Sequence, residues 1–326
     1  MSVLLTLLVA GGILAPHGLG LRRASPAVAA AIWLSALAVR ALTVVYLAMY
    51  LVLLLPATEA FVAVTHWCWH TVIPLLTTHL GLDGHRIGDT AVILPAVVLA
   101  ASLVSVTFGV VRAARAVRRL LINASLGPGP SDSLIVGGAE VMVAAAGIAR
   151  PRIVVSAGAL TVLDDEELAA GLDHERGHIE RHHRFLFVFA ELCRGLARFL
   201  PGTRRVMTEL TFHLERDADR WALARRHDPF ALASAICKAA TARAASGLAL
   251  ASLSGSAGVT DRLNELVDGP SGDVTRSDRV LLRCAAYALV SMALALAAML
   301  PAMVAAGVGQ ASDGPVVSAR TACDHR

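Results

Sequence analysis

Four long apolar runs constrain this chain more than any other feature, because each is long enough to cross a lipid bilayer. They cover Ser2–Leu21, Val28–Pro56, Ala91–Val111 and Val280–Val308. About 20 mostly apolar residues are needed to cross the hydrocarbon core. None of the runs alternates between apolar and polar residues as a barrel strand does, so each predicts a transmembrane helix. We therefore expect a mainly α-helical membrane protein with about four spans.

The composition agrees with this class and excludes others. Of the 326 residues 56% are hydrophobic and 17% are charged, whereas a soluble domain has about 25% charged residues. Hydrophobicity this high excludes a disordered chain. A net charge of +4 and an aromatic content of 5% argue against direct binding of nucleic acid. The cysteines share no CxxC spacing, which argues against a zinc ribbon or a disulfide scaffold (Cys68, Cys193, Cys237, Cys284 and Cys323).

Two of the runs leave alternatives open. Ser2–Leu21 has the length of a signal peptide, but its positive charges, Arg22 and Arg23, follow the apolar residues instead of preceding them. This order favours a retained helix. Arg40 lies inside the second run. Either its side chain faces the helix bundle, or the span begins at Ala41 and Arg40 lies at the membrane surface.

Basic residues set the expected orientation. They follow the first run and the third run, and the positive-inside rule places both groups in the cytoplasm (Arg22, Arg23, Arg112, Arg115, Arg118 and Arg119). We therefore expect a multi-pass protein of the cytoplasmic membrane, with the lipid bilayer as a partner. It comprises a membrane region with three spans (1–111), a cytoplasmic domain (112–279), a fourth span (280–308) and a short extracytoplasmic tail (309–326). Cys68 and Cys323 would share the oxidising side and could pair, although two unrelated thiols is the simpler interpretation.

The polar insert between the third and fourth runs has the pattern of an α+β domain. A turn-rich linker at 127–133 precedes three β-type runs, Leu134–Val136, Glu140–Ala144 and Arg152–Ser156. Asp164 can cap a helix that runs to about His183, because Glu167 lies three residues on. Phe185–Leu200 is short and interrupted by charges, so it predicts a core or membrane-skirting helix. Further helices are expected over Thr203–Arg226 and Pro229–Ser246, followed by a loop at 247–259.

The strongest chemical signal is the HExxH motif formed by residues 174–178, on the predicted helix after Asp164. Its i, i+4 spacing places His174 and His178 on one helix face, where both imidazoles can bind one Zn²⁺. Glu175 is offset by one position, so it can reach a metal-bound water and act as the general base. The alternative is a solvated face of histidine and glutamate without a metal.

A catalytic zinc needs a third protein ligand, and the next long helix offers one. Glu215 begins an ExxAD pattern, and Asp219 lies one turn later, where its carboxylate could hold the tautomer of a ligand imidazole. His213 and Asp217 are rivals for these roles, but His213 points elsewhere on the helix. His182 and His183 extend the histidine cluster. Because Arg181 and Arg184 occupy the glycine and histidine positions of HExxHxxGxxH, we interpret these histidines as surface groups or as supports for the ligands.

Taken together, these features form an ordered set: N-terminal spans, PRIVVSAGAL at Pro151–Leu160, HERGH, ExxAD, Asp261-Arg262-Leu263 and a last span. The set resembles the BlaR/MecR-type membrane metallopeptidases and, more distantly, the HtpX and CAAX prenyl endopeptidase group. The resemblance implies a gluzincin-like zinc peptidase domain facing the cytoplasm between the third and fourth spans. It implies zinc ligation by His174, His178 and Glu215, with Glu175 catalytic. The chain leaves no room after the last run for the penicillin-binding domain of the β-lactam receptors, so we do not expect such a receptor.

The expected activity is zinc-dependent hydrolysis of peptide bonds in a protein substrate. The resemblance implies signal-dependent cleavage of a winged-helix transcriptional repressor, with quality control of membrane proteins as an alternative. A non-catalytic zinc-binding signalling protein is a second alternative. The strand Arg152–Ser156 could be the edge to which substrate adds, or an ordinary core strand. Only proximity to Glu215 suggests an oxyanion stabiliser (His213, Arg216 or Arg220).

Overall fold

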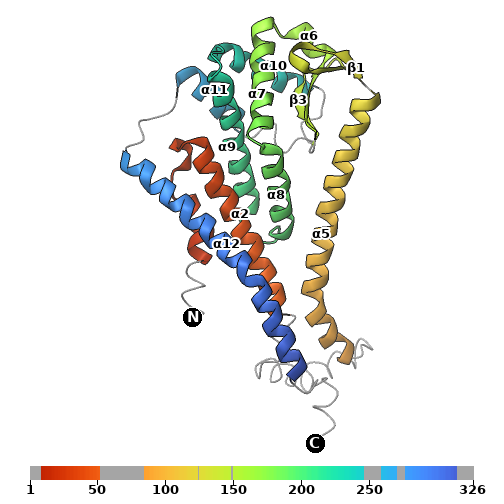
Figure 1. Ribbon diagram of the computed structural model, residues 1–326, viewed down its shortest axis with the longest axis vertical. Coiled ribbons are helices and arrows are strands. Elements are labelled where there is room, and N and C mark those ends of the chain that lie inside the picture. Colours follow the sequence, from red (N-terminus) through yellow and green to blue (C-terminus); the bar gives the residue numbers. More distant parts are fainter. Residues whose placement is uncertain are drawn as a thin grey trace, which may run out of the picture.

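The computed structural model describes residues 9–51, 84–123, 125–147, 150–245, 258–269 and 276–313. It is mostly helical, with one small sheet (Figure 1). A domain at one end holds the sheet and the helices packed against it. Three long helices, α2 (Pro26–Met49), α5 (Gly84–Asn123) and α12 (Arg276–Asp313), extend away from this end. Cys68 and Cys323, whose pairing was left open, and most of the expected 247–259 loop lie outside the described residues.

Three helices among the described residues are long and apolar enough to cross a membrane. They are Pro26–Met49, Val97–Ala116 within α5, and Arg276–Ala305 within α12. They correspond to the second, third and fourth apolar runs. Residues 9–14 of the first run are helical, but Ala15–His17 and Leu21–Arg23 form separate 3-10 turns, η1 and η2. The prediction of one helix through Leu21 is therefore wrong from Ala15 onward. Pro16 removes a helical hydrogen bond there, and residues 2–8 lie outside the described part.

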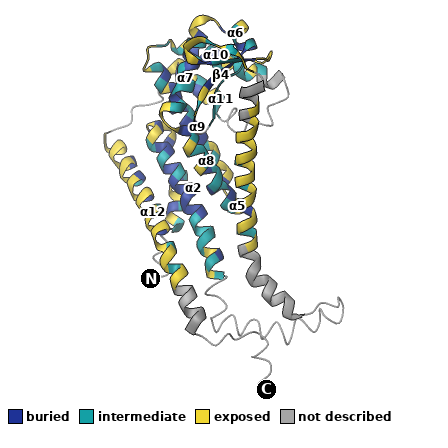
Figure 2. Ribbon diagram, turned by 45° about the vertical axis from the view of Figure 1, so that its right-hand side comes forward, coloured by how far each residue is buried: buried dark blue, intermediate teal, exposed yellow. Residues whose placement is uncertain are grey.

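Helix α2 is an interior helix. Within its most apolar stretch 61% of the residues are buried, against 6% for α5 and 11% for α12 (Figure 2). It packs against α8 (His183–Leu196), α9 (Thr203–Leu223) and α12. Arg40 is 2% exposed, and its Nη2 donates to the carbonyl oxygen of Ile13 at 3.3 Å. Of the two alternatives for Arg40, the structure supports the one in which its side chain faces the bundle.

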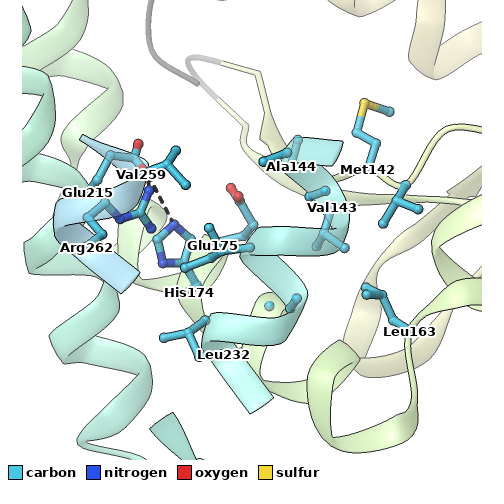
Figure 3. Close-up of a pocket in the computed structure, with 16 residues that line it drawn as sticks. Met142, Val143, Ala144, Leu163, His174, Glu175, Glu215, Leu232, Val259 and Arg262 are labelled. Atoms are coloured by element: carbon cyan, nitrogen blue, oxygen red, sulfur yellow. Dashed lines mark hydrogen bonds and ion pairs between the residues drawn. The ribbon is translucent and has the colours of Figure 1, made fainter. Parts of the chain in front are cut away.

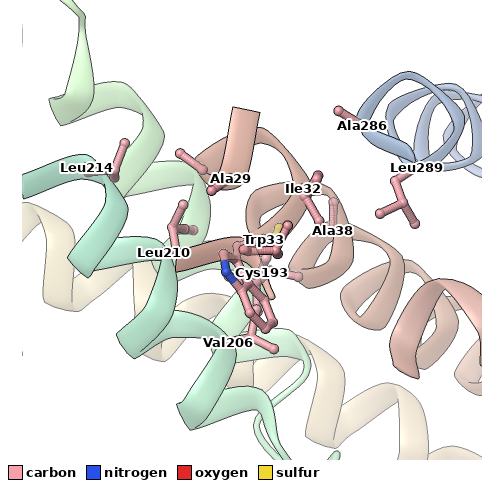
Figure 4. Close-up of a cluster of buried hydrophobic side chains, with 14 of the residues drawn as sticks. Ala29, Ile32, Trp33, Ala38, Cys193, Val206, Leu210, Leu214, Ala286 and Leu289 are labelled. Carbon is pink, nitrogen blue, oxygen red and sulfur yellow. The ribbon is translucent and has the colours of Figure 1, made fainter. Parts of the chain in front are cut away.

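The core around α2 joins the long helices to the sheet-bearing domain. Ile32 and Trp33 of α2 lie in one buried cluster with Leu210 and Leu214 of α9 and with Leu289 of α12 (Figure 4). These side chains are all less than 9% exposed. Burial of each large aliphatic or aromatic side chain contributes roughly 1.5–3 kcal/mol. Helix α9 is therefore anchored to the first membrane-length helix along much of its length.

The sheet has four strands in the order β1-β2-β4-β3. They are β1 (Ser125–Pro128), β2 (Leu134–Val136), β3 (Val143–Ala146) and β4 (Arg152–Ser156). β2 and β4 are parallel, while β1 pairs with β2 and β3 pairs with β4 in antiparallel fashion. Strand β1 was not predicted, because Gly127 and Pro128 indicate a turn; as an edge strand it tolerates both residues. β3 begins three residues later than its predicted run.

The predicted domain helices α7 (Asp165–Glu180), α8, α9 and α10 (Pro229–Ala245) occur in the expected order with shifted ends. Two further helices, α6 (Ala157–Val162) before α7 and α11 (Val259–Asp268) after α10, were not predicted. The predicted cap is confirmed, because Asp164 and Glu167 form a reciprocal capping box at the start of α7. α7 ends at Glu180 rather than His183, since His182 adopts a left-handed conformation (φ 56°) that separates α7 from α8.

Candidate metal centre

Two helices bring together the three residues predicted to bind metal. His174 and His178 lie on α7, and Glu215 lies on α9. One potential ligand atom from each lies within 4.8 Å of the others. The two Nε2 atoms are 3.3 Å apart, and the Glu215 carboxylate oxygens lie 3.5 Å from Nε2 of His174 and 3.6 Å from Nε2 of His178. Two imidazoles and one carboxylate are a donor set that suits zinc and leaves a coordination position open.

A close helix crossing makes this geometry possible. Gly177 lies on α7 against Trp221 of α9, and a Cβ atom at Gly177 would lie 2.9 Å from the Trp221 ring. The absence of a side chain at Gly177 lets α7 approach α9 closely. The approach places the histidine face of α7 opposite Glu215.

Each imidazole has a neighbour that can fix its tautomer. Nδ1 of His174 lies 2.9 Å from a carboxylate oxygen of Asp219, as the ExxAD spacing suggested. Nδ1 of His178 lies 2.9 Å from Nδ1 of His183, whose Nε2 lies 3.3 Å from Asp217. If His183 donates to Asp217, its Nδ1 accepts from His178. Both ligand histidines then direct an unprotonated Nε2 toward the metal position.

Arg262 of α11 is the residue that sequence reasoning missed. Its guanidinium donates to Glu215 at 2.8 Å and to both carboxylate oxygens of Asp219 at 2.7 and 2.8 Å. Arg262 is 6% exposed. The sequence analysis named Arg262 only within the Asp261-Arg262-Leu263 motif and gave it no role at the metal site. No local pattern connects position 262 with positions 215 and 219. This arginine balances the charge of two buried carboxylates and holds one Glu215 oxygen in place.

The charges of the site are strongly coupled. Burial alone would lower the pKa of His174, but the carboxylates of Asp219 and Glu215 outweigh it and raise this pKa to about 10. Burial, reinforced by the positive charge of its neighbours, lowers the pKa of His178 to about 3. Burial opposes ionisation of Glu215, but Arg262 and His178 hold the pKa of its carboxyl far below its usual range. A divalent cation would therefore displace a proton from His174 and meet a neutral His178.

Glu175 faces the strand β3 (Figure 3). Its Oε2 accepts a hydrogen bond of 2.7 Å from the backbone N–H of Ala145. Two cavities flank it, of about 350 Å³ and about 240 Å³. Both are lined by Ala144, Glu175 and Glu215, and most other lining residues of the larger cavity are aliphatic. The arrangement places a carboxylate between a strand edge and a candidate metal group, with space on both sides.

Comparison with known families identifies this part of the chain. The family model of peptidase family M48 matches residues 113–211. Over these residues the chain is similar to peptidases of family M48. The matched M48 segment contains α7 with His174, Glu175 and His178, and it ends four residues before Glu215. No curated protein and no solved structure matches the chain.

Peptidases of family M48 are zinc enzymes, so the similarity over residues 113–211 points to metalloprotease chemistry. The M48 model does not extend to the third candidate ligand, so the assignment of Glu215 depends on the geometry above. That geometry also separates Glu215 from its rivals. Asp217 supports His183, and His213 is fully buried with its Nδ1 3.2 Å from Arg216.

The candidates for oxyanion stabilisation do not lie at the candidate metal site. Arg216 and Arg220 pair with Glu265, and neither they nor His213 line the two cavities beside Glu175. His213 lies two positions before Glu215, Arg216 one position after it and Arg220 five positions after it, so none of them shares the Glu215 face of α9. His182 is exposed, whereas His183 is 2% exposed and contacts His178. The two adjacent histidines thus divide between the two interpretations given above.

Proposed function

We propose that this protein is a membrane-bound zinc endopeptidase that hydrolyses peptide bonds of a protein substrate on the cytoplasmic side. One observation carries the proposal: His174, His178 and Glu215 converge from two helices, and Glu175 lies beside them at a strand edge. The basic residues that follow the apolar runs support the cytoplasmic orientation.

In the proposed reaction, zinc would polarise the scissile carbonyl and lower the pKa of a water molecule to about 7. His174, His178 and Glu215 would hold the ion. Glu175 would accept a proton from the attacking water and deliver it to the leaving amine. Asp219 and the His183–Asp217 pair would keep both imidazoles in the metal-binding tautomer, and Arg262 would keep Glu215 oriented.

Strand β3 is the edge to which we propose that substrate adds. β4 lies between β2 and β3, so the alternative that β4 is a core strand holds, and β3 takes the place of the edge. The Ala145 N–H points away from β4, since it donates to Glu175. An extended substrate pairing with β3 would accept this hydrogen bond and displace Glu175 toward the metal position. The aliphatic lining of the larger cavity favours apolar substrate side chains.

Two classes of protein substrate follow from the two resemblances. Similarity to the BlaR/MecR type supports cleavage of a regulator, such as a winged-helix repressor, in response to a signal. Similarity to the HtpX group supports degradation of damaged membrane proteins. The classes differ in the number of substrates: a regulator is cut at one or two places, whereas quality control produces many cuts.

The experiment that separates them compares new protein N-termini in cells that carry the unsubstituted protein or Glu175→Gln. A few Glu175-dependent cuts in one DNA-binding protein support regulation, and many cuts in membrane proteins support quality control. Identical N-termini in both strains under several envelope stresses would favour the non-catalytic zinc protein instead. Glu180→Gln, on the exposed end of the same helix, serves as the matched control.

A further inference from the structure

The smaller of the two cavities beside Glu175 contains a cationic side chain that the proposed reaction does not use. This side chain is Arg184, the second residue of α8. It lines the cavity of about 240 Å³ together with Glu175, His178 and Glu215. An arginine therefore lies in the wall of a space that opens directly onto the candidate metal position.

Arg184 is held in place without being neutralised. Its Nη1 donates to the carbonyl oxygen of Ile179 at 3.2 Å, and its guanidinium carbon lies 4.7 Å from the centre of the Phe185 ring. Its Nε is buried without a hydrogen-bond partner, and no carboxylate pairs with it in the part of the chain that the structure describes. Arg181 and Arg194, on either side of it in the sequence, each have an acidic partner. Buried polar groups normally have partners, so a ligand is expected for this arginine.

The two cavities differ in charge for this reason. Arg262 lines the larger cavity, but the carboxylates of Glu215 and Asp219 neutralise it at 2.7–2.8 Å. Arg184 has no such neighbour, and the first turn of α8 contains no acidic residue that could offset it. The smaller cavity therefore favours an anionic group, whereas the larger, mostly aliphatic cavity favours an apolar one.

The cavities follow one another along β3 and the residues that precede it. Residues 141–144 line the larger cavity, and residues 144, 145 and 147 line the smaller one. Ala144 and Glu175 belong to both cavities, so the general base lies where they meet (Figure 3). An extended chain advances about 3.3 Å per residue. A substrate strand paired with β3 would thus place side chains in both cavities, one on each side of Glu175.

We propose that Arg184 binds the carboxylate of an aspartate or glutamate in the substrate, across the scissile bond from an apolar residue held in the larger cavity. The inference rests on the proposed function and assigns a specificity to the same site. A guanidinium group is well suited to carboxylate recognition, because it donates paired, charge-assisted hydrogen bonds. Arg184 does not pair with Glu215, although both line the cavity, so it is set back from the metal ligands. This position suits a substrate side chain rather than the reacting carbonyl.

The test profiles the cleavage of randomised, end-blocked decapeptides by the zinc-loaded full chain in detergent. Mass spectrometry of the products gives the residues on both sides of each cut. We expect Asp and Glu to be enriched about tenfold at one position within about three residues of the cut, the effect of one hydrogen bond between charged groups. Apolar residues should be enriched on the opposite side of the cut.

Two substitutions separate charge recognition from a structural role. Arg184→Gln should remove the preference for acidic residues. Arg184→Glu should reverse it in favour of Lys and Arg, which a loss of packing would not do. Arg194→Gln is the matched control, because Arg194 lies on the same helix, pairs with Glu191 and lines neither cavity. The preference for acidic residues should be the same in this control as in the unsubstituted chain.

Peptide binding gives a second readout that does not require cleavage. Glu175→Gln protein is incubated with the same peptides, and those it retains should be enriched in acidic residues unless Arg184→Gln is also present. Such enrichment without any cleavage by the unsubstituted chain would refute the proposed function but not the role of Arg184.

Three results would overturn the inference itself. The first is a profile without acidic preference in the unsubstituted chain, in cleavage and in binding. The second is an acidic preference that survives Arg184→Gln. The third is an equal loss of cleavage for all peptides in Arg184→Gln with the preference unchanged, because the arginine would then act on the reacting carbonyl.

Discussion

His183 offers the sharpest test of how the candidate metal centre is supported. Its ring is 2% exposed and links His178 to Asp217 through contacts of 2.9 and 3.3 Å. His183→Phe fills similar volume but removes the acceptor for Nδ1–H of His178. A buried donor without a partner costs about 1–3 kcal/mol. His178 can avoid this cost by moving its proton to Nε2, which then has to be removed before a metal binds.

We therefore expect His183→Phe to weaken zinc binding about 10- to 100-fold, which corresponds to roughly 1.4–2.7 kcal/mol. Competition with a chromophoric chelator measures the affinity in detergent or nanodiscs. His182→Asn is the matched control: His182 is adjacent but exposed, and asparagine tolerates its left-handed backbone. Zinc affinity within twofold of the unsubstituted protein, with circular dichroism unchanged, would refute the proposed support of His178 by His183.

Two further predictions concern stability, and a third concerns zinc binding. Arg262→Met should lower the free energy of unfolding of the metal-free domain by about 3–5 kcal/mol, because it leaves two buried carboxylates without their cation. The control Asp261→Asn removes an exposed ion pair and should cost less than about 1 kcal/mol. Similar thermal midpoints for the two variants would contradict this prediction. Burial would raise the pKa of Glu167, but hydrogen bonds from a lysine and a serine outweigh this effect and lower the pKa below 4.5. The ionised Glu167 therefore stabilises the fold fully above pH 4.5, and this stabilisation is lost as the pH falls through the folded-state pKa. Glu167→Gln should thus lower the thermal midpoint at pH 7, with the difference shrinking below pH 4.5; a constant difference would count against it. Gly177→Ala should abolish tight zinc binding, because the added methyl group would push α7 away from α9. Gly171→Ala is the control, since a Cβ atom there would meet no atom closer than 4.0 Å, and it should leave zinc binding intact. Equal zinc affinity in both variants would disprove the role of the close helix crossing.

The sequence predicted correctly those helices whose position depends on interactions between residues close together in the chain. Asp164 and Glu167 predicted the start of α7, because a capping box is formed within four consecutive residues. The three membrane-length helices among the described residues were predicted from the length and hydropathy of their apolar runs. β1 was missed because glycine and proline disfavour a strand unless it lies at a sheet edge, and edge position is a property of the whole sheet.

The site shows the same division. The spacing of His174 and His178 within one helix, and of Glu215 and Asp219 within another, is visible in the sequence because helix periodicity determines which side chains share a face. Arg262 comes from a third helix 43 residues beyond Asp219, and no periodicity connects the two. The role of β3 as the free edge was likewise hidden, since either strand could be an edge until their order in the sheet is known.

The central claim is that Glu175 performs chemistry at a metal held by its neighbours, and one pair of measurements tests it directly. The purified full chain and Glu175→Gln are compared for bound zinc and for cleavage of a substrate identified from Glu175-dependent N-termini. The account predicts equal zinc content, near one ion per chain, and a loss of cleavage of at least about 100-fold, the contribution of a general base. A zinc-loaded Glu175→Gln protein that cleaves at the unsubstituted rate would contradict the account.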